Sequence, residues 1–274
     1  MKLIDPSVEL MTQPQGIEGI YKHIEAVART CYKSEDKVTE DSAEPFVNRL
    51  IKSKHLAMVE HATVYMEGAP EIDDIKFWQV ANSPYSKVVS DSESSKLYVT
   101  TNLRVLIENN AMELLDKYLC EPTEHHAKRI TLKFITNIGV SREANRHRRF
   151  CIAEQSTRYC NFSKEKFGKE ITFIKPSWYD NSCLDDMSAR FKDALSYLEF
   201  RYMGLIAEGW KPQQAREVLP LSTATEVVYT AFEDDWTHFF DLRYRGTTGA
   251  PHPNMLQIAT MAHDLILNKL GKDL

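Results

Sequence analysis

Four arginines and one histidine lie close together near the middle of the chain, within residues 142–149 (REANRHRR). Guanidinium groups bind phosphate through paired hydrogen bonds, and they stay charged where water is excluded. A carboxylate, a hydroxyl and a further guanidinium follow at Glu154, Ser156 and Arg158. This mixture suits a ligand that has both a phosphate and a heterocycle, so it indicates a nucleotide site. A solvated basic face or an RNA-binding patch is the alternative.

The charge of the whole chain argues against a general nucleic-acid-binding protein. Its 274 residues include 34 Lys and Arg against 39 Asp and Glu, which gives a net charge of -5. Proteins that bind nucleic acid generally carry a basic excess that neutralises phosphates. We therefore expect no nucleic-acid partner. The length and the 43% hydrophobic content are enough to bury a core.

The apolar pattern and the cysteine content of the sequence both predict a cytoplasmic protein. The first residues, MKLIDPSVEL, lack the apolar segment of a signal peptide, and no apolar run reaches the length of a membrane span. The five cysteines are scattered and form no CxxC pair, which is typical of free thiols in a reducing compartment. His55 and His61 are too irregularly spaced for a standard metal site, so we expect no metal.

Hydrophobic periodicity predicts the elements that must position the basic cluster. Alternating or β-branched segments predict strands, and apolar stripes at helical spacing predict helices. There is no alternating βαβ pattern and no glycine-rich phosphate-binding motif. The expected fold class is α+β, with a modest antiparallel sheet and several long helices. The predicted strands are 62–68, 128–140 and 226–232, and the predicted helical segments are 17–30, a helix after 41–42, 103–119, 185–209, 233–245 and 254–270.

The order of residues within the cluster resembles the signature of one enzyme family. Arg146-His147-Arg148, followed after seven residues by Ser156, matches the RHR-x7-S motif of flavin-dependent thymidylate synthases (ThyX). The longer motif RHRxxSxNxxSxRY is met except at Cys151 and Ala153, which replace a serine and an asparagine. The resemblance implies a ThyX-like fold and the conversion of dUMP to dTMP.

Shorter matches to the same family lie on both sides of this motif. They are ARTC (28–31), HLAMVEH (55–61), REVLP (216–220) and FFDLR (239–243). The chain is much longer than compact family members between His61 and Arg146. We therefore expect a single domain over residues 1–274 with an inserted hairpin or helical arm at about 68–127.

The resemblance implies roles for individual residues. For FAD it implies contacts from Arg146, His147, Arg148, Glu154, His238, His55 and Glu60. For dUMP it implies contacts from Glu143, Asn145, Arg146, Glu154, Gln155, Ser156, Thr157, Arg158, Arg216 and Arg243. Arg158 and Arg216 would clamp the phosphate. Glu143 stands where the family commonly has glutamine, and Phe232 stands where it has a flavin-contacting asparagine. His252 lies in a loop, 250–255, that departs from the family pattern.

Arg243 matches the arginine that activates the uracil ring, and it is the expected catalytic residue. Methylation at C5 requires negative charge on the pyrimidine, and a fixed guanidinium stabilises that charge. The family uses methylene-tetrahydrofolate as carbon donor, FAD as hydride carrier and NADPH as reductant, without a cysteine nucleophile. It assembles as homotetramers with shared active sites. Cys151 lies inside the motif but has no evident histidine and acid partners.

Two hypotheses from other classes compete with this enzyme. One is a non-catalytic nucleotide-binding or RNA-binding module that uses residues 142–149. It predicts no flavin and an affinity that falls steeply with salt. The other is a family member that has lost activity because of its departures at Cys151, Ala153 and Phe232 and in the 250–255 loop. It predicts flavin binding without dTMP formation.

Overall fold

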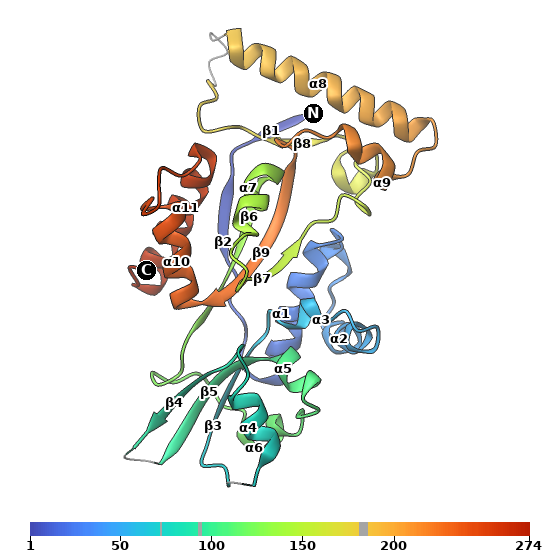
Figure 1. Cartoon of the computed structure of the whole chain (residues 1–274). Coiled ribbons are helices and arrows are strands. Elements are labelled where there is room, and N and C mark those ends of the chain that lie inside the picture. Colours follow the sequence, from blue (N-terminus) through green and yellow to red (C-terminus); the bar gives the residue numbers. More distant parts are fainter. Residues whose placement is uncertain (72, 93–94, 181–185) are drawn as a thin grey trace.

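The computed structural model describes residues 1–71, 73–92, 95–180 and 186–274 (Figure 1). Residues 72, 93 and 94 of the predicted insertion, Cys183, and the first residue of the predicted 185–209 helix lie outside the described residues. The described part is arranged in three tiers, with β1 and α8 at one end of Figure 1 and β3, β4 and β5 at the other.

The central tier is a four-stranded antiparallel sheet. Its order is β2-β6-β9-β7, formed by β2 (Ser7–Leu10), β6 (Arg129–Asn137), β9 (Ala224–Phe232) and β7 (Cys151–Glu154). β6 and β9 pair along their whole lengths. The predicted alternation in β6 is confirmed, because Ile130, Leu132 and Phe134 are all buried on one face of the sheet.

Helices cover both faces of this sheet. α10 (Glu233–Arg243) and α11 (Pro253–Leu270) pack on the face that carries Phe134, in a core with Tyr229 and Trp236. α1 (Gly16–Thr30) packs on the other face, where Val27 meets Val228. α11 ends at Gly271, which adopts the left-handed conformation expected of a helix-terminating glycine. Because both faces are buried, the sheet is a rigid base that positions the segments connected to the ends of its strands.

The predicted insertion contributes most of a second antiparallel sheet, with the order β3-β5-β4. Its core is shared with α1, since Ile20 and Ile24 pack in the same cluster as Val64 and Val99. The segment 68–127 therefore contains both a hairpin and several helices, and it packs against α1. Its elements are α4 (Ile75–Ala81), β4 (Lys87–Asp91), β5 (Lys96–Asn102), α5 (Leu103–Glu108) and α6 (Leu114–Tyr118), and they are preceded in the chain by α2 (Ala43–Lys52), α3 (Leu56–Val59) and β3 (Thr63–Gly68).

The third tier joins the N-terminus to a distant part of the chain. β1 (Lys2–Ile4) pairs in parallel with β8 (Thr172–Ile174), and α8 (Asp186–Ala207) lies across them (Figure 1). The short helix α9 (Pro212–Ala215) begins at Pro212, as expected from the preference of proline for the first helical turn. The α+β class with small antiparallel sheets is confirmed.

Two predicted elements are wrong in extent. The strand predicted over 128–140 ends at Asn137, whose side chain caps a helix that begins at Ile138. Residues 103–119 form two helices, α5 and α6, in place of one helical segment. The break falls after Glu108, where Asn110 has a positive φ of 51°. Asparagine tolerates this left-handed conformation better than most residues, so it ends a helix where the apolar spacing alone continues.

Candidate functional site

The RHR residues occupy a turn between a short helix and an edge strand. α7 (Ile138–Ala144) follows β6 directly, and the Asn137 side chain caps it by accepting a hydrogen bond from the Val140 amide at 2.8 Å. The amides of Arg146 and His147 bond back to the end of the helix, and the chain then returns as β7. The turn is thus held at both ends by the central sheet.

Within this turn the histidine points inward and both arginines point outward. His147 is buried, and its ring centroid lies 5.0 Å from that of Phe239 and 5.8 Å from that of His238. Arg146 and Arg148 are exposed. Burial, with the Arg243 charge nearby, lowers the pKa of His147 to about 4. His147 is therefore neutral at pH 7.

Arg243, at the end of α10, is held by His147 and by Glu143. Its Nε donates to His147 Nε2 at 3.2 Å, and Nη2 donates to the Glu143 backbone carbonyl at 3.4 Å. The Glu143 carboxylate lies 3.6 Å from Nη1. Because a neutral imidazole accepts through only one nitrogen, the proton of His147 must reside on Nδ1. A charged guanidinium is thus fixed beside the RHR turn.

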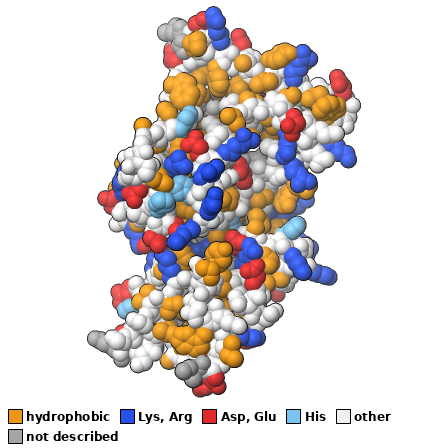
Figure 2. Space-filling view, viewed as in Figure 1, with side chains coloured by type: hydrophobic (Ala, Val, Ile, Leu, Met, Phe, Trp, Pro, Cys, Tyr) orange, Lys and Arg blue, Asp and Glu red, His pale blue; other side chains and the backbone are white. Residues whose placement is uncertain are grey.

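The RHR turn and the end of α10 surround a cavity of about 340 Å³, which we call the Arg243 cavity. It brings together the predicted catalytic residue and four predicted flavin residues from the turn and α10. Lys, Arg and His side chains gather over the same middle tier in Figure 2. The lining residues are Arg146, His147, Arg148, Arg149, Phe150, Asp235, His238, Leu242 and Arg243.

A second cavity, of about 610 Å³, contains most of the predicted dUMP residues. We call it the Arg216 cavity. Gln155, Ser156, Thr157 and Arg158 line it from the segment after β7, and Arg216 lines it from the turn after α9. Its remaining lining residues are Ile138, Arg142, Glu154, Glu217, Leu219, Pro220, Leu221 and Thr225.

Three guanidinium groups therefore share the Arg216 cavity. Arg216 lies 3.6 Å from Glu217 and donates to Thr157 at 3.4 Å. Among the described residues, Arg142 and Arg158 form no ion pair within 4 Å, although Arg158 lies over the Tyr159 ring. Unpaired guanidinium groups that face one cavity provide a site for an anion. The sequence had not assigned a ligand contact to Arg142 individually, and its position in the basic run was the available signal.

Glu154 is the predicted site residue with the least free hydrogen-bonding capacity. One carboxylate oxygen accepts from Ser141 at 2.7 Å and Thr225 at 3.1 Å, and the other accepts from Asn145 at 3.2 Å. Asn145 in turn accepts a hydrogen bond from Tyr229 at 2.8 Å. These contacts show Glu154 and Asn145 as a bridge between α7, β7 and β9 that supports the cavity wall.

Four predicted residues do not line these two cavities, namely Asn145, Glu143, His55 and Glu60. Glu143 faces a third cavity, of about 570 Å³, together with Trp178 and His252. His55 is exposed at the start of α3. Glu60 follows the same helix and forms an ion pair with Arg104. In the part of the chain that the structure describes, His55 and Glu60 are not among the residues that line the Arg243 and Arg216 cavities.

Two residues that depart from the family pattern, Cys151 and Phe232, make defined contacts in the structure. Cys151 accepts a hydrogen bond from Arg129 at 3.2 Å, and its burial raises the thiol pKa to about 11. A thiol with this pKa is a poor nucleophile at neutral pH. Phe232 is buried beneath the Lys87 ammonium group, 4.5 Å from the ring centroid, so its side chain contacts the second sheet.

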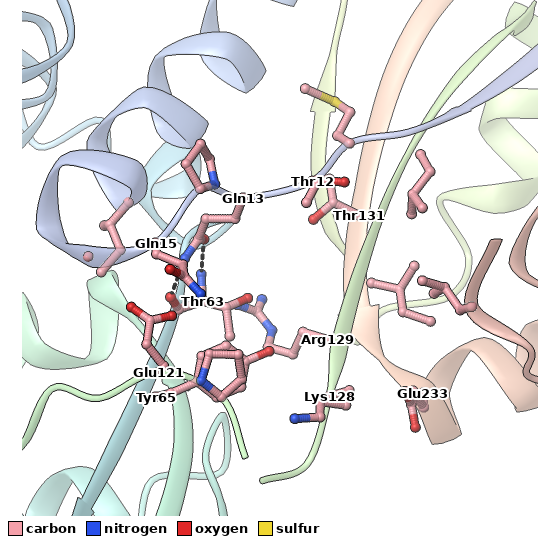
Figure 3. Close-up of a pocket in the computed structure, with 18 of the residues that line it drawn as sticks. Thr12, Gln13, Gln15, Thr63, Tyr65, Glu121, Lys128, Arg129, Thr131 and Glu233 are labelled. Carbon is pink, nitrogen blue, oxygen red and sulfur yellow. Dashed lines mark hydrogen bonds between the residues drawn. The ribbon is translucent and has the colours of Figure 1, made fainter. Parts of the chain in front are cut away.

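A further cavity, of about 650 Å³, lies between the central and second sheets (Figure 3). We call it the Tyr65 cavity. Gln13 and Thr63 are joined across part of it by two hydrogen bonds of 2.8 Å. Lys128 and Arg129 also line it, but none of the predicted site residues does, among those that the structure describes.

The described residues contain no group of three or more His, Cys, Asp or Glu side chains that could hold a metal ion. No helix within the described ranges is both long and apolar enough to cross a membrane.

Comparisons with known proteins place the motif in a family. Residues 109–266 match the family model of the thymidylate synthase complementing protein. No curated protein matches the chain by sequence. Two solved structures of the UMP/dUMP methylase PolB from Streptomyces cacaoi resemble it. The one bound with 5-Br dUMP is 16% identical over 98% of this chain and 93% of that chain, with a TM-score of 0.47. The one bound with 5-Br UMP is 14% identical over 97% and 91%, with a TM-score of 0.48.

Proposed function

This chain belongs to the thymidylate synthase complementing protein family, and on that premise we propose that it converts dUMP to dTMP by reductive methylation. The observation that carries the proposal is that α7 and the turn after it supply guanidinium groups to two cavities, Arg142 to one and Arg146 and Arg148 to the other. The Arg216 cavity offers guanidinium groups to an anion, and the Arg243 cavity offers one fixed guanidinium beside the RHR turn.

In this proposal the Arg216 cavity holds the nucleotide. Arg142, Arg158 and Arg216 bind the phosphate, since guanidinium groups form charge-assisted hydrogen bonds with phosphate oxygens. Ser156, Thr157 and Gln155 supply neutral donors and acceptors for the sugar and the base. Glu154 and Asn145 have a structural role, because their hydrogen bonds hold α7, β7 and β9 together behind the cavity.

Arg243 is the proposed catalytic residue. Electron density must reach C5 of the uracil ring, and negative charge then develops on N3 and the carbonyl oxygens. A guanidinium held in place before the reaction stabilises this charge without reorganising. His147 and the Glu143 carbonyl fix its orientation, so both are positioning residues for Arg243.

The positive charge of the Arg243 cavity lining matches an anionic cofactor such as FAD, part of which would occupy the cavity. Arg146 and Arg148 are exposed on the turn and, among the described residues, form no ion pair within 4 Å. They would hold the cofactor together with His238, and His55 and Glu60 are proposed as further contacts on the family motif alone. Bound reduced FAD would supply the hydride that converts the transferred methylene carbon into a methyl group.

The other reactants follow from the balance of the reaction. Methylene-tetrahydrofolate gives its one-carbon unit to C5, which loses its proton, and leaves as tetrahydrofolate after gaining two protons, equivalent to the one from C5 and one from solvent. Two electrons and one proton, delivered as hydride, originate from NADPH, which becomes NADP⁺. No covalent enzyme intermediate is required, and the buried Cys151 thiol agrees with that route.

We also propose a homotetramer that works in the cytoplasm. Tyr197 and Phe200 on α8 expose 54% and 68% of their surfaces, and large exposed apolar side chains on one helix suit a subunit interface. The free cysteines among the described residues fit a reducing compartment.

The proposal is tested by incubating the purified protein with dUMP, methylene-tetrahydrofolate, NADPH and FAD, and measuring dTMP by chromatography. We expect dTMP to form only when all four are present. Oxidation of NADPH and binding of FAD without dTMP would identify a family member that has lost the methylation activity. Failure to bind FAD, combined with salt-sensitive binding of RNA, would favour the RNA-binding alternative.

A further inference from the structure

The Tyr65 cavity, between the central sheet and the second sheet, is lined by none of the described residues that we assign to the proposed reaction (Figure 3). Its volume of about 650 Å³ is within the range of small-molecule sites. Protein interiors are packed so closely that few internal spaces are larger than a water molecule. A space of this volume between two sheets therefore holds either solvent or a ligand.

Most of the surface of this cavity is apolar. The apolar side chains come from β2, α1, β6, the segment after α6 and the end of α11, and the Tyr65 ring adds an aromatic face from β3. Such a surface holds water weakly, because a bound water needs roughly two to four polar partners. An apolar ring, in contrast, gains free energy when it leaves water for this surface. The apolar side chains include Leu10, Met11, Ile20, Leu119, Ile130 and Leu270.

The charged side chains of the lining nearly balance one another. Three cations, Lys128, Arg129 and Lys272, face the cavity together with two carboxylates, Glu121 and Glu233. Lys272 forms an ion pair with Glu233, whereas Lys128 and Arg129 donate hydrogen bonds to backbone carbonyls. An anion would have to compete with these contacts, and an uncharged ligand would leave them in place.

Two polar side chains of the lining keep free hydrogen-bonding groups. Thr12 and Gln15 lie between β2 and α1, and both are exposed, so the cavity opens to solvent there. Neither side chain is hydrogen-bonded within the described part of the chain, and Gln15 does not cap α1. A hydroxyl and an amide can each donate and accept, so they suit one polar group on a ligand.

We propose that the Tyr65 cavity binds an uncharged small molecule that has an aromatic ring and one polar group. The ring lies among the apolar side chains and against Tyr65, where two rings pack edge to face or offset. The polar group bonds to Thr12 or Gln15 at the opening. Each reactant of the proposed reaction carries phosphate or carboxylate groups, so the ligand of this cavity is a different molecule. The assignment therefore does not depend on the proposed function.

Fluorescence titration with N-phenyl-1-naphthylamine, an uncharged probe, tests the class of ligand. We expect the probe to bind at one site per chain and 2-naphthol to displace it at pH 7. In 2-naphthoate a carboxylate replaces the hydroxyl, so we expect it to displace the probe about 10-fold less well or worse. A wild-type protein that does not bind the probe, or equal displacement by the two competitors, would overturn the proposal.

Matched leucine variants locate the bound probe. Leu270 and Leu267 lie on α11 and expose 40% and 42% of their surfaces, but of the two only Leu270 lines the cavity, as the described residues define it. Leu270→Trp should weaken probe binding about 10-fold or more, because the larger ring occupies the space, and Leu267→Trp should bind as the wild type does.

Thr12→Trp adds a ring to the lining from a second segment and should also weaken binding. All three sites are exposed, so circular dichroism should show an unchanged fold. Wild-type probe affinity in both Leu270→Trp and Thr12→Trp would place the probe elsewhere and contradict the assignment.

Discussion

The Arg216 and Tyr65 cavities have similar volumes, about 610 and 650 Å³, but they differ in whether their cationic side chains are paired with other groups of the protein. In the Tyr65 cavity, Arg129 donates to the carbonyls of Glu60 and Ala62, and Lys272 forms an ion pair with Glu233. In the Arg216 cavity, Arg142 and Arg158 form no ion pair within 4 Å, among the described residues. The cations of the Tyr65 cavity are thus bound by groups of the protein, whereas Arg142 and Arg158 of the Arg216 cavity are available to an anion.

This difference shows that cavity size is a weak guide to function in this molecule. Arg142 and Arg158 are exposed and form no ion pair among the described residues, so their guanidinium groups can bind a phosphate without first losing a protein partner. Lys128 illustrates the opposite case, because its ammonium group donates to the Thr123 carbonyl and lies over the Tyr65 ring (Figure 3).

The largest effect should come from Arg243→Ala. Removing a fixed group that stabilises developing charge lowers turnover by about 10²–10³-fold in other enzymes. We expect a loss of that order in kcat for dTMP formation, while Lys128→Ala in the Tyr65 cavity leaves kcat within about 2-fold of the wild type. Equal losses in the two variants would mean that the distinction between the cavities is wrong.

A smaller effect is expected from Arg216→Ala. A hydrogen bond to a charged group contributes about 1.5–3 kcal/mol, so dUMP should bind about 10- to 150-fold more weakly. Deoxyuridine, which lacks the phosphate, should bind the variant and the wild type alike. Lys272→Ala is the control, since it breaks an ion pair of the Tyr65 cavity. Equal weakening of dUMP and deoxyuridine would contradict a phosphate role for Arg216.

Two buried histidines, His147 in the Arg243 cavity and His23 beside the Tyr65 cavity, should make stability depend on pH. Burial lowers the pKa of His147 and of His23 to about 4, and His23 lies 3.4 Å from Thr131 in the wall of the Tyr65 cavity. Between about pH 6.5 and 4 the unfolded chain binds protons that the folded chain does not. The free energy of unfolding should therefore fall as pH falls, by up to about 1.4 kcal/mol per pH unit for each group.

Urea unfolding at pH 7, 6 and 5 checks this expectation. His23→Gln and His147→Gln should each flatten the pH dependence, because each removes one of the two groups. Only His147→Gln should also lower turnover, since His147 positions Arg243. An unchanged slope in both variants would show that other groups set the pH dependence.

Cys151→Ser should have the smallest effect. The thiol pKa of about 11 keeps it protonated at neutral pH, so dTMP formation should stay within about 2-fold of the wild type. Iodoacetamide at pH 8 should leave Cys151 unmodified in the folded protein, as peptide mass spectrometry would show. Loss of turnover together with alkylation at Cys151 would revive a covalent mechanism.

The sequence predicted the strands and helices that carry the site better than the contacts that individual side chains make within it. Strand β6 and helix α10 were predictable because alternation and helical spacing act over neighbouring residues. The parallel pair β1–β8 was not predicted, since three-residue strands about 170 positions apart carry no local signal. The end of α5 was missed because Asn110 overrides a continuing apolar stripe.

The same limit applies to the site residues. The motif predicted a cluster that includes His147 and Glu154, but spacing could not show that His147 turns inward to hold Arg243. Nor could it show that Glu154 accepts hydrogen bonds from Ser141 and Thr225, which are far from it in sequence or on another element. Side-chain direction in a turn is set by long-range packing, which one sequence does not reveal.

The most direct test of the central claim is the visible absorption spectrum of the FAD-loaded protein during titration with dUMP, with deoxyuridine as the control. The account predicts a flavin spectrum that shifts on adding dUMP and responds much less to deoxyuridine, because the arginines of the Arg216 cavity bind the phosphate beside the cofactor. A protein that takes up no FAD, or whose flavin spectrum does not respond to dUMP, would contradict it.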